Sequence, residues 1–326
     1  MKNNKGKIVL VLPEHRVPSG AKERIEGLSD GRAVEIVSQT ADLGKIAEDV
    51  EVAAGEFPFQ LLPRCSNLRW LQLWYAGADW IQRFPDVKTM PFRITTASGI
   101  HGSQMTEHLF GMLLAWYRKF PEAFAAQKNS QWAKFQFSDT DVLAGKTLLI
   151  VGYGTIGKHM ARVGRAFDMA VIGVRKNPSV RGVNADGDRE EGLDSLKTLL
   201  PLADIVVNVL PLTPETRGLF NAELLGTLRK DALFVNIGRG GTVDEGALIL
   251  ALQKKTIAGA LLDVASEEPL PSTSPLWALE NCMLTSHYAG FHPRYDEQAL
   301  ALFLENLERY TQGGELKNVV DKLAGY

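Results

Sequence analysis

The sequence predicts an α/β protein that is built from two doubly wound, parallel-sheet domains. Two observations point to this class: short and almost wholly apolar runs alternate with segments long enough for helices, and the alternation occurs in two separate series. Continuous apolar runs are typical of parallel strands that helices cover on both faces. With 326 residues, 45% of them hydrophobic, the chain is long enough to bury two cores.

The first hundred residues form the first series. Its strands are expected at 7–12, 32–37, 68–74 and 92–98. Each is a short apolar run, and the pieces between the runs are short and partly helical. These runs predict a small α/β unit.

A long helix and a polar segment come next. Residues 102–120, GSQMTEHLFGMLLAWYRKF, have the length and the apolar face of a helix, with Ser103 or Thr106 as its cap. Residues 127–141 are polar and predict a connecting arm.

The second series fills most of the remaining chain. Its strands are expected at 146–151, 170–174, 204–209, 232–237, 258–264 and 282–286. Helices are expected between them at 155–167, 193–200, 221–229 and 244–254, and a last helix at 295–312. Strands that alternate with helices in this way predict a doubly wound sheet.

Composition and charge exclude several classes of protein. The chain has 36 basic and 38 acidic residues without a long run of one sign, which argues against a nucleic-acid-binding protein. Cys65 and Cys282 are too few for a disulfide framework. The apolar run near the N-terminus is too short for a signal peptide, and no segment approaches the roughly 18–20 apolar residues of a membrane span. We expect a cytoplasmic protein without a metal site.

A glycine-rich turn, IVGYGTIG at 150–157, predicts a dinucleotide site. Gly152, Gly154 and Gly157 form the pattern G-x-G-x-x-G between an expected strand and an expected helix, which is the context that gives this pattern meaning. Gly152 allows the tight turn, Gly154 allows a pyrophosphate to approach the backbone, and Gly157 allows close packing of the helix. The helix N-terminus then offers N–H groups to the phosphates.

Two cations follow the second strand of this unit, where an acidic residue usually binds the ribose hydroxyls. Arg175 can pair bidentately with a 2′-phosphate, and Lys176 adds a point charge. The pair therefore predicts NADP(H) in preference to NAD(H). The alternatives are a solvated pair at a strand end and an arginine that stacks beside the adenine.

Three strand ends in the second series carry chemically useful side chains. Arg239 follows one strand, Glu267 and Glu268 follow the next, and His287 follows the last. Ligands of open parallel sheets bind outside the carboxyl ends of the strands. An arginine that binds a carboxylate, a histidine that donates a proton and a glutamate that holds the histidine form a set suited to reducing a 2-keto acid.

The remaining polar candidates are weaker. Asp263 ends a strand, where it is either a structural cap or a hydrogen-bond partner of a nicotinamide carboxamide. The other histidines, which we interpret as surface or packing residues, are His15, His101, His108, His159 and His292.

The whole chain resembles the D-isomer-specific 2-hydroxyacid dehydrogenases. The matching stretches are LAGKTLLIVGYGTIGKHMA, VNVLPLTPETRGLF, LFVNIGRGGTVDEGAL, GALLDVASEEPLP and TSHYAG. The resemblance implies that Arg239, Glu268 and His287 are catalytic. It also implies that backbone N–H groups near Ala76, Gly77 and Ala78 hold the substrate carboxylate.

The resemblance adds further cofactor residues. Thr155 and Ile156 should lie over the pyrophosphate. The expected neighbours of the adenosine, the phosphates and the nicotinamide are Leu210, Pro211, Thr216, Ile237 and Asp263.

The resemblance also implies an architecture and a function. A Rossmann cofactor domain, residues 101–292, is inserted into a flavodoxin-like substrate domain of residues 1–100 and 293–326. Members usually form homodimers, and Trp132 in the arm either reaches the partner or packs locally. Because Arg175 replaces the usual acidic residue, the expected activity is an NADP(H)-dependent reductase of glyoxylate or hydroxypyruvate type.

Two alternatives to this function stay open. One is a nucleotide-sensing binding protein on the same fold. The other is an NAD-dependent dehydrogenase of another substrate, namely phosphoglycerate, formate or a bulky keto acid.

Overall fold

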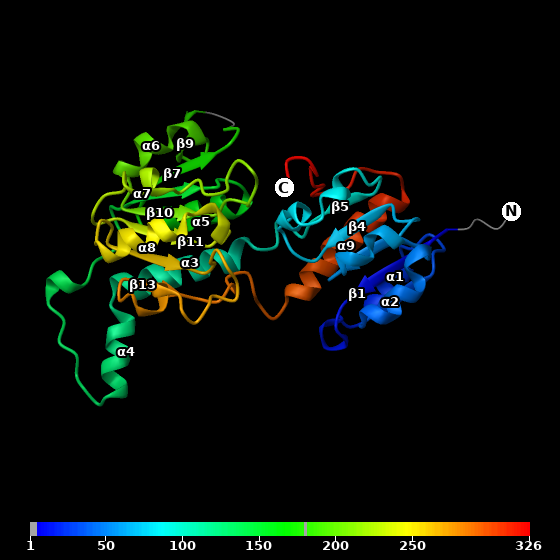
Figure 1. Cartoon of the computed structure of the whole chain (residues 1–326), viewed down its shortest axis with the longest axis horizontal. Coiled ribbons are helices and arrows are strands. Elements are labelled where there is room, and N and C mark those ends of the chain that lie inside the picture. Colours follow the sequence, from blue (N-terminus) through cyan, green and yellow to red (C-terminus); the bar gives the residue numbers. More distant parts are fainter. Residues whose placement is uncertain (1–4, 179–180) are drawn as a thin grey trace. The chain divides into compact units, whose positions relative to one another are not determined.

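The structure, a computed structural model, describes residues 5–178 and 181–326. The chain forms two compact units (Figure 1). Unit 1 comprises Met1–Ile100 and His292–Tyr326, and unit 2 comprises His101–Phe291. The first unit is therefore discontinuous in sequence, and the second lies within it along the chain.

Unit 1 contains a five-stranded parallel sheet in the order β2-β1-β3-β4-β5. Its strands are β1 (Lys7–Val11), β2 (Val34–Val37), β3 (Val50–Gly55), β4 (Trp70–Leu73) and β5 (Arg93–Thr95). Its α-helices are α1 (Ala21–Glu26), α2 (Thr40–Ile46) and α9 (Tyr295–Thr311). The central strand β3 was not expected from the sequence. Its small residues Ala53, Ala54 and Gly55 give a weak strand signal, and pairing with both neighbours overrides it.

Helix α9 completes the core on one face of this sheet. Ala299, Leu300, Phe303 and Leu307 are buried in one cluster with Trp70 and Trp74. The Phe303 ring lies 5.3 Å from the Trp70 ring, centroid to centroid. Although α9 comes from the C-terminal part of the sequence, its apolar face therefore completes the core of unit 1.

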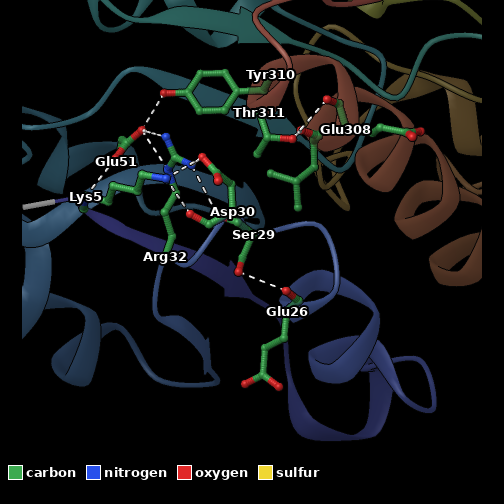
Figure 2. A network of polar contacts seen from close by, with 11 residues as sticks. Lys5, Glu26, Ser29, Asp30, Arg32, Glu51, Glu308, Tyr310 and Thr311 are labelled. Carbon is green, nitrogen blue, oxygen red and sulfur yellow. Dashed lines mark hydrogen bonds and ion pairs between the residues drawn. The ribbon is translucent and has the colours of Figure 1, made fainter. Parts of the chain in front are cut away.

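A network of ion pairs fastens the end of α9 to the amino edge of the same sheet (Figure 2). Glu51 on β3 accepts hydrogen bonds from Arg32 Nε at 3.0 Å, from the Tyr310 hydroxyl at 2.8 Å and from Gly6 N at 2.8 Å. Burial raises the pKa of Glu51, but these donors outweigh it, so that the pKa lies below its usual value. The network stabilises the ionised carboxylate of Glu51.

Unit 2 contains an eight-stranded sheet in the order β13-β12-β11-β10-β6-β7-β9-β8. Every pair is parallel except β8–β9. The strands are β6 (Thr147–Val151), β7 (Ala170–Arg175), β8 (Gly182–Val183), β9 (Arg189–Gly192), β10 (Ile205–Asn208), β11 (Leu233–Asn236), β12 (Gly259–Leu262) and β13 (Cys282–Leu284). The short strands β8 and β9 were not expected, because β8 has only two residues and the sequence of β9, REEG, is polar.

Helices cover both faces of this sheet, which confirms the predicted fold class. The α-helices are α3 (Gly102–Tyr117), α4 (Phe120–Lys128), α5 (Thr155–Ala166), α6 (Leu196–Leu199), α7 (Ala222–Leu225) and α8 (Glu245–Gln253). Side chains of α3 and α5 share one buried cluster with the strands, and those of α6, α7 and α8 share another.

The helix expected at 102–120 is α3, which ends at Tyr117, and a second helix, α4, begins at Phe120. The break lies at Lys119, whose φ of 59° is left-handed, and α4 then leads into a stretch at 129–136 without regular structure (Figure 1). The segment exposes large aromatic side chains, including Trp132 at 91% and Phe137 fully. In the part of the chain that the structure describes, no helix is long and apolar enough to cross a membrane.

Candidate active site

The glycine-rich turn joins β6 to α5. Gly152 has a φ of 113°, and a Cβ there would lie 2.8 Å from the backbone of Val209, so only glycine fits. Gly154 is exposed, with nothing within 4 Å of the place a Cβ would take. No side chain of the described residues caps α5, which begins at Thr155. Its first N–H groups therefore have no side-chain cap, as a phosphate site at a helix N-terminus requires.

The side chain of Tyr153 holds the glycine-rich turn in place. Its side chain is fully buried, and its hydroxyl donates a hydrogen bond to the buried carboxylate of Asp188. Arg165 at the end of α5 binds the same carboxylate. Burial and the bond to Asp188 raise the pKa of Tyr153 to about 12, so the hydroxyl stays protonated as a donor. The turn, α5 and the β8–β9 hairpin are thereby held together.

The two cations expected to bind a 2′-phosphate lie at the end of β7. Arg175 is half-buried and Lys176 is exposed. Lys176 Nζ lies 2.5 Å from Glu215 Oε2, and Glu215 belongs to the loop after β10. This ion pair brings together two segments that the sequence suggested separately as cofactor-binding. Glu215 itself was missed, because a single exposed glutamate in a loop gives no signal.

The loop after β10 carries Leu210, Pro211 and Thr216. Leu210 is buried and Pro211 is exposed. The Thr216 hydroxyl donates to the Pro211 carbonyl at 2.6 Å and accepts from Thr213 N at 2.8 Å. The Thr216 side chain therefore links two other residues of the loop and stabilises the conformation of the loop backbone.

Arg239, Glu268 and His287 follow β11, β12 and β13, which are neighbours in the sheet. Parallel strands place these three loops at one edge. A Cβ on Gly240, the residue after Arg239, would collide with the carbonyl of Ala265, so the loops after β11 and β12 are in backbone contact.

Glu268 and His287 form a close pair. Glu268 Oε2 lies 2.6 Å from His287 Nδ1, and Glu268 Oε1 accepts from Ala265 N at 3.0 Å. The His287 side chain is 47% exposed, and its φ of 56° is left-handed, an uncommon conformation for a non-glycine residue. Since Glu268 binds Nδ1, the Nε2 atom is the one that can exchange a proton with a bound molecule.

Asp263 fixes the backbone that carries His287. Its carboxylate is 2% exposed and accepts hydrogen bonds from the Thr285 hydroxyl at 2.6 Å, Tyr288 N at 3.2 Å and Ala289 N at 3.0 Å. Its carbonyl accepts from His287 N at 2.7 Å. The Asp263 carboxylate, which the sequence suggested as a partner of a nicotinamide, therefore already accepts three hydrogen bonds within the protein.

His108 on α3, which the sequence suggested as a surface or packing residue, extends this arrangement. Its Nε2 lies 3.0 Å from the Thr285 hydroxyl and 3.7 Å from Asp263 Oδ1. Burial lowers the pKa of His108, while the charge of Asp263 opposes this effect. Ile237, expected beside the nicotinamide, is buried directly after β11.

The expected substrate loop lies in unit 1, after β4. Among the described residues, the N–H groups of Ala76, Gly77 and Ala78 have no recorded acceptor. Trp74, two residues before Ala76, is held on both sides: its Nε1 donates to Asp296 at 3.0 Å, and its carbonyl accepts from the Tyr295 hydroxyl at 2.7 Å. The base of the loop is therefore fixed to the start of α9.

The described residues contain no group of three histidine, cysteine, aspartate or glutamate side chains that could hold a metal ion.

Comparison with known proteins identifies the family. A family model described as D-isomer specific 2-hydroxyacid dehydrogenase, NAD binding domain, matches residues 110–289. A glyoxylate reductase of Aeropyrum pernix is 34% identical over 237 residues, which cover 70% of this chain and 69% of that enzyme.

Two solved structures are similar over nearly the whole chain. One is a D-isomer specific 2-hydroxyacid dehydrogenase of Xanthobacter autotrophicus in complex with NADPH and MES; its TM-score is 0.82 at 30% identity, covering 99% of this chain and 100% of that one. The other is an NADPH-dependent glyoxylate/hydroxypyruvate reductase of Sinorhizobium meliloti in complex with NADP and sulfate. Its TM-score is 0.82 at 27% identity, with coverages of 98% and 100%. Since the family model spans more than half of the 326 residues, this chain belongs to the D-isomer specific 2-hydroxyacid dehydrogenases, NAD(P)-dependent oxidoreductases that act on CH–OH groups.

Proposed function

We propose that this protein is an NADP(H)-dependent reductase that converts small 2-keto acids, such as glyoxylate or hydroxypyruvate, into D-2-hydroxy acids. The observation that carries the proposal is the 2.6 Å pair of Glu268 and His287 at the sheet edge where Arg239 also lies. A general acid that a carboxylate orients, next to a guanidinium, suits a substrate with a carboxylate beside a ketone.

Each side chain of the site has a separate role in the proposed reaction. Glu268 holds His287 at Nδ1, which leaves Nε2 to donate a proton to the oxygen of the reduced carbonyl. Arg239 binds the substrate carboxylate and stabilises the negative charge that develops on the carbonyl oxygen. The N–H groups of Ala76, Gly77 and Ala78 are further donors for the carboxylate.

The reduced nicotinamide, when bound, supplies the hydride. The uncapped N-terminus of α5 and the open face of Gly154 fit a pyrophosphate. We assign unit 2 as the dinucleotide-binding domain and unit 1 as the substrate domain.

The preference for NADP(H) rests on Arg175 and Lys176. The Arg175 guanidinium offers a planar fork that matches a 2′-phosphate, and Lys176 adds a cation that Glu215 holds in place. An acidic residue at this strand end would repel that phosphate. The NADPH and NADP complexes of the two similar structures agree with this preference.

Turnover measurements test the proposal. Oxidation of NADPH and of NADH by the purified protein is followed at the absorbance band of the reduced nicotinamide, with glyoxylate, hydroxypyruvate, pyruvate and phenylpyruvate. We expect NADPH to be oxidised much faster than NADH with glyoxylate or with hydroxypyruvate. Arg175→Ala should lower kcat/KM for NADPH by about 10- to 100-fold, the loss of one charged hydrogen-bonded pair, and leave NADH nearly unaffected.

Arg189→Ala is the matched control, because Arg189 is 48% exposed and pairs only with its near neighbour Glu191 among the contacts described. Equal rates with both cofactors would contradict the NADP(H) preference but keep the reductase. Tight binding of NADPH without turnover of any keto acid would refute the reductase and support a nucleotide-sensing protein.

A further inference from the structure

A cluster of buried polar side chains lies beneath the loops that follow β10 and β11. Asn208 and Thr242 are fully buried, and Asn236 is 2% exposed. Asn208 and Asn236 are register partners, and each ends a strand whose other residues are apolar. Buried amides destabilise a core unless they are hydrogen-bonded, so their contacts reveal what holds them there.

Asn208 is the centre of the cluster. Its Nδ2 donates to Asn236 Oδ1 at 3.0 Å and to the Thr242 hydroxyl at 2.6 Å, which uses both of its N–H groups. Its Oδ1 accepts from Leu210 N at 3.3 Å, so the same side chain also contacts the loop after β10.

The other two side chains converge on the backbone of Arg239. Its carbonyl accepts from Asn236 Nδ2 at 3.1 Å and from the Thr242 hydroxyl at 2.6 Å. A third donor to that carbonyl is Thr242 N at 3.2 Å. Asn236 Oδ1 in turn accepts from Gly238 N at 3.2 Å. The cluster therefore holds the backbone at Gly238 N and at the Arg239 carbonyl from inside the sheet.

The side chain of Arg239 leaves this fixed backbone and donates from Nη1 to the Gly238 carbonyl at 2.8 Å. A guanidinium at the end of a long side chain keeps its direction only if its base is fixed. Complete hydrogen bonding among buried polar groups favours one geometry over the alternatives that an apolar contact would tolerate.

We propose that Asn208, Asn236 and Thr242 are positioning residues that hold Arg239 in register with the Leu210–Pro211 loop. The inference rests on the proposed function, in which Arg239 binds the keto acid, and on the family resemblance, which implies that Leu210 and Pro211 border the cofactor. A displacement of about 1 Å at a reacting group costs on the order of 100-fold in rate. The cluster thus fixes the arginine without contacting substrate or cofactor.

Thr242→Val is the main test, because valine keeps the shape of threonine and replaces only the hydroxyl with a methyl group. We expect kcat/KM for glyoxylate to fall by about 10- to 100-fold. The Kd of NADPH, measured by titration of nicotinamide fluorescence, should stay at the wild-type value, and Thr242→Ser should restore kcat/KM. If Thr242→Val does not fold, Thr242→Ala replaces it.

Thr106→Val is the matched control. Thr106 is 4% exposed, lies in the same unit, and donates its hydroxyl to the Gly102 carbonyl at 2.6 Å within α3. Both valine variants should lower the thermal midpoint, but only Thr242→Val should lower kcat/KM. Equal effects of the two variants on kcat/KM would mean that Thr242 is merely structural and would overturn the proposal.

A double-mutant cycle with Arg239→Ala completes the test. If Thr242 acts through Arg239, Thr242→Val should cause little further loss of kcat/KM in the Arg239→Ala protein. A loss as large as in the wild type would refute the inference. A wild-type protein that binds NADPH but reduces no keto acid would refute the proposed function, and the inference with it, whereas an active wild type with an unaffected Thr242→Val refutes the inference alone.

Discussion

Glu268 and Glu267 are adjacent glutamates with different surroundings, and this contrast gives a prediction at the scale of single residues. Glu268→Gln keeps a hydrogen-bonding group near His287 Nδ1 but replaces the carboxylate that orients the ring with a neutral amide. We expect kcat for glyoxylate reduction to fall by about 100-fold, within the range of general acid–base effects. Steady-state kinetics at saturating NADPH measure it. Glu267→Gln should have no such effect, and equal losses in both variants would contradict the role given to Glu268.

The sequence predicts the surroundings of some residues of the candidate site better than those of others. The strand pattern alone indicated that Arg239, Glu268 and His287 follow neighbouring parallel strands. The contacts of Asp263 with Tyr288 N and Ala289 N depend on the path of an irregular loop, which no local pattern encodes. The buried Asn208 had a visible signal: an asparagine at the end of an otherwise apolar strand, which needs a partner in the core.

At the scale of elements, strand β3 shows where local pattern fails. Its run VEVAAG holds a glutamate, two alanines and a glycine, which are residues depleted in strands. The strand forms because β1 and β4 pair with it on either side and because Glu51 is ionised within the network of Arg32 and Tyr310. Tertiary contacts of this kind are invisible to a reading of one segment.

The Glu51 network predicts how unit 1 responds to acid. The folded-state pKa of Glu51 lies below the ordinary value of 4.5, so its stabilising contribution is present above pH 4.5 and is lost as the pH falls through the folded-state pKa. Glu51→Gln should lower the free energy of unfolding at pH 7 by about 1.5–3 kcal/mol, the value of hydrogen bonds to a charged group. In the Glu51→Gln variant, the thermal midpoint should also decrease less than in the wild type as the pH falls below 4.5.

Thermal melts between pH 3 and 7 measure both effects. Glu48→Gln is the control, because Glu48 is exposed on the turn before β3. If the thermal midpoints of the wild type and of Glu51→Gln decrease equally steeply below pH 4.5, the prediction is contradicted.

At the scale of the whole molecule, the fold class followed from the alternation of strands and helices, whereas assembly does not follow from it. We propose a homodimer, to which the segment from α4 to Phe137 contributes, because that segment exposes large aromatic side chains: Phe120, Phe124, Trp132, Phe135 and Phe137. Exposed apolar surface of this extent marks interaction sites. Analytical ultracentrifugation should give about twice 35.8 kDa for the wild type and a smaller mass for the double variant Trp132→Ala/Phe137→Ala.

Leu323→Ser is the control for this experiment, since Leu323 is 77% exposed and lies outside the segment. A wild type that sediments as a monomer at micromolar concentration would rule out the dimer.

The discontinuity of unit 1 also dictates an order of events during synthesis. Strands β1 to β5 leave the ribosome first, yet the helix that buries Trp70 and Trp74 is made last, after the whole of unit 2. At about 5–20 residues per second, the first sheet waits on the order of ten to forty seconds for α9. During that interval one apolar face of the nascent sheet stays open to chaperones and to other nascent chains, while the unit that began later is already able to fold.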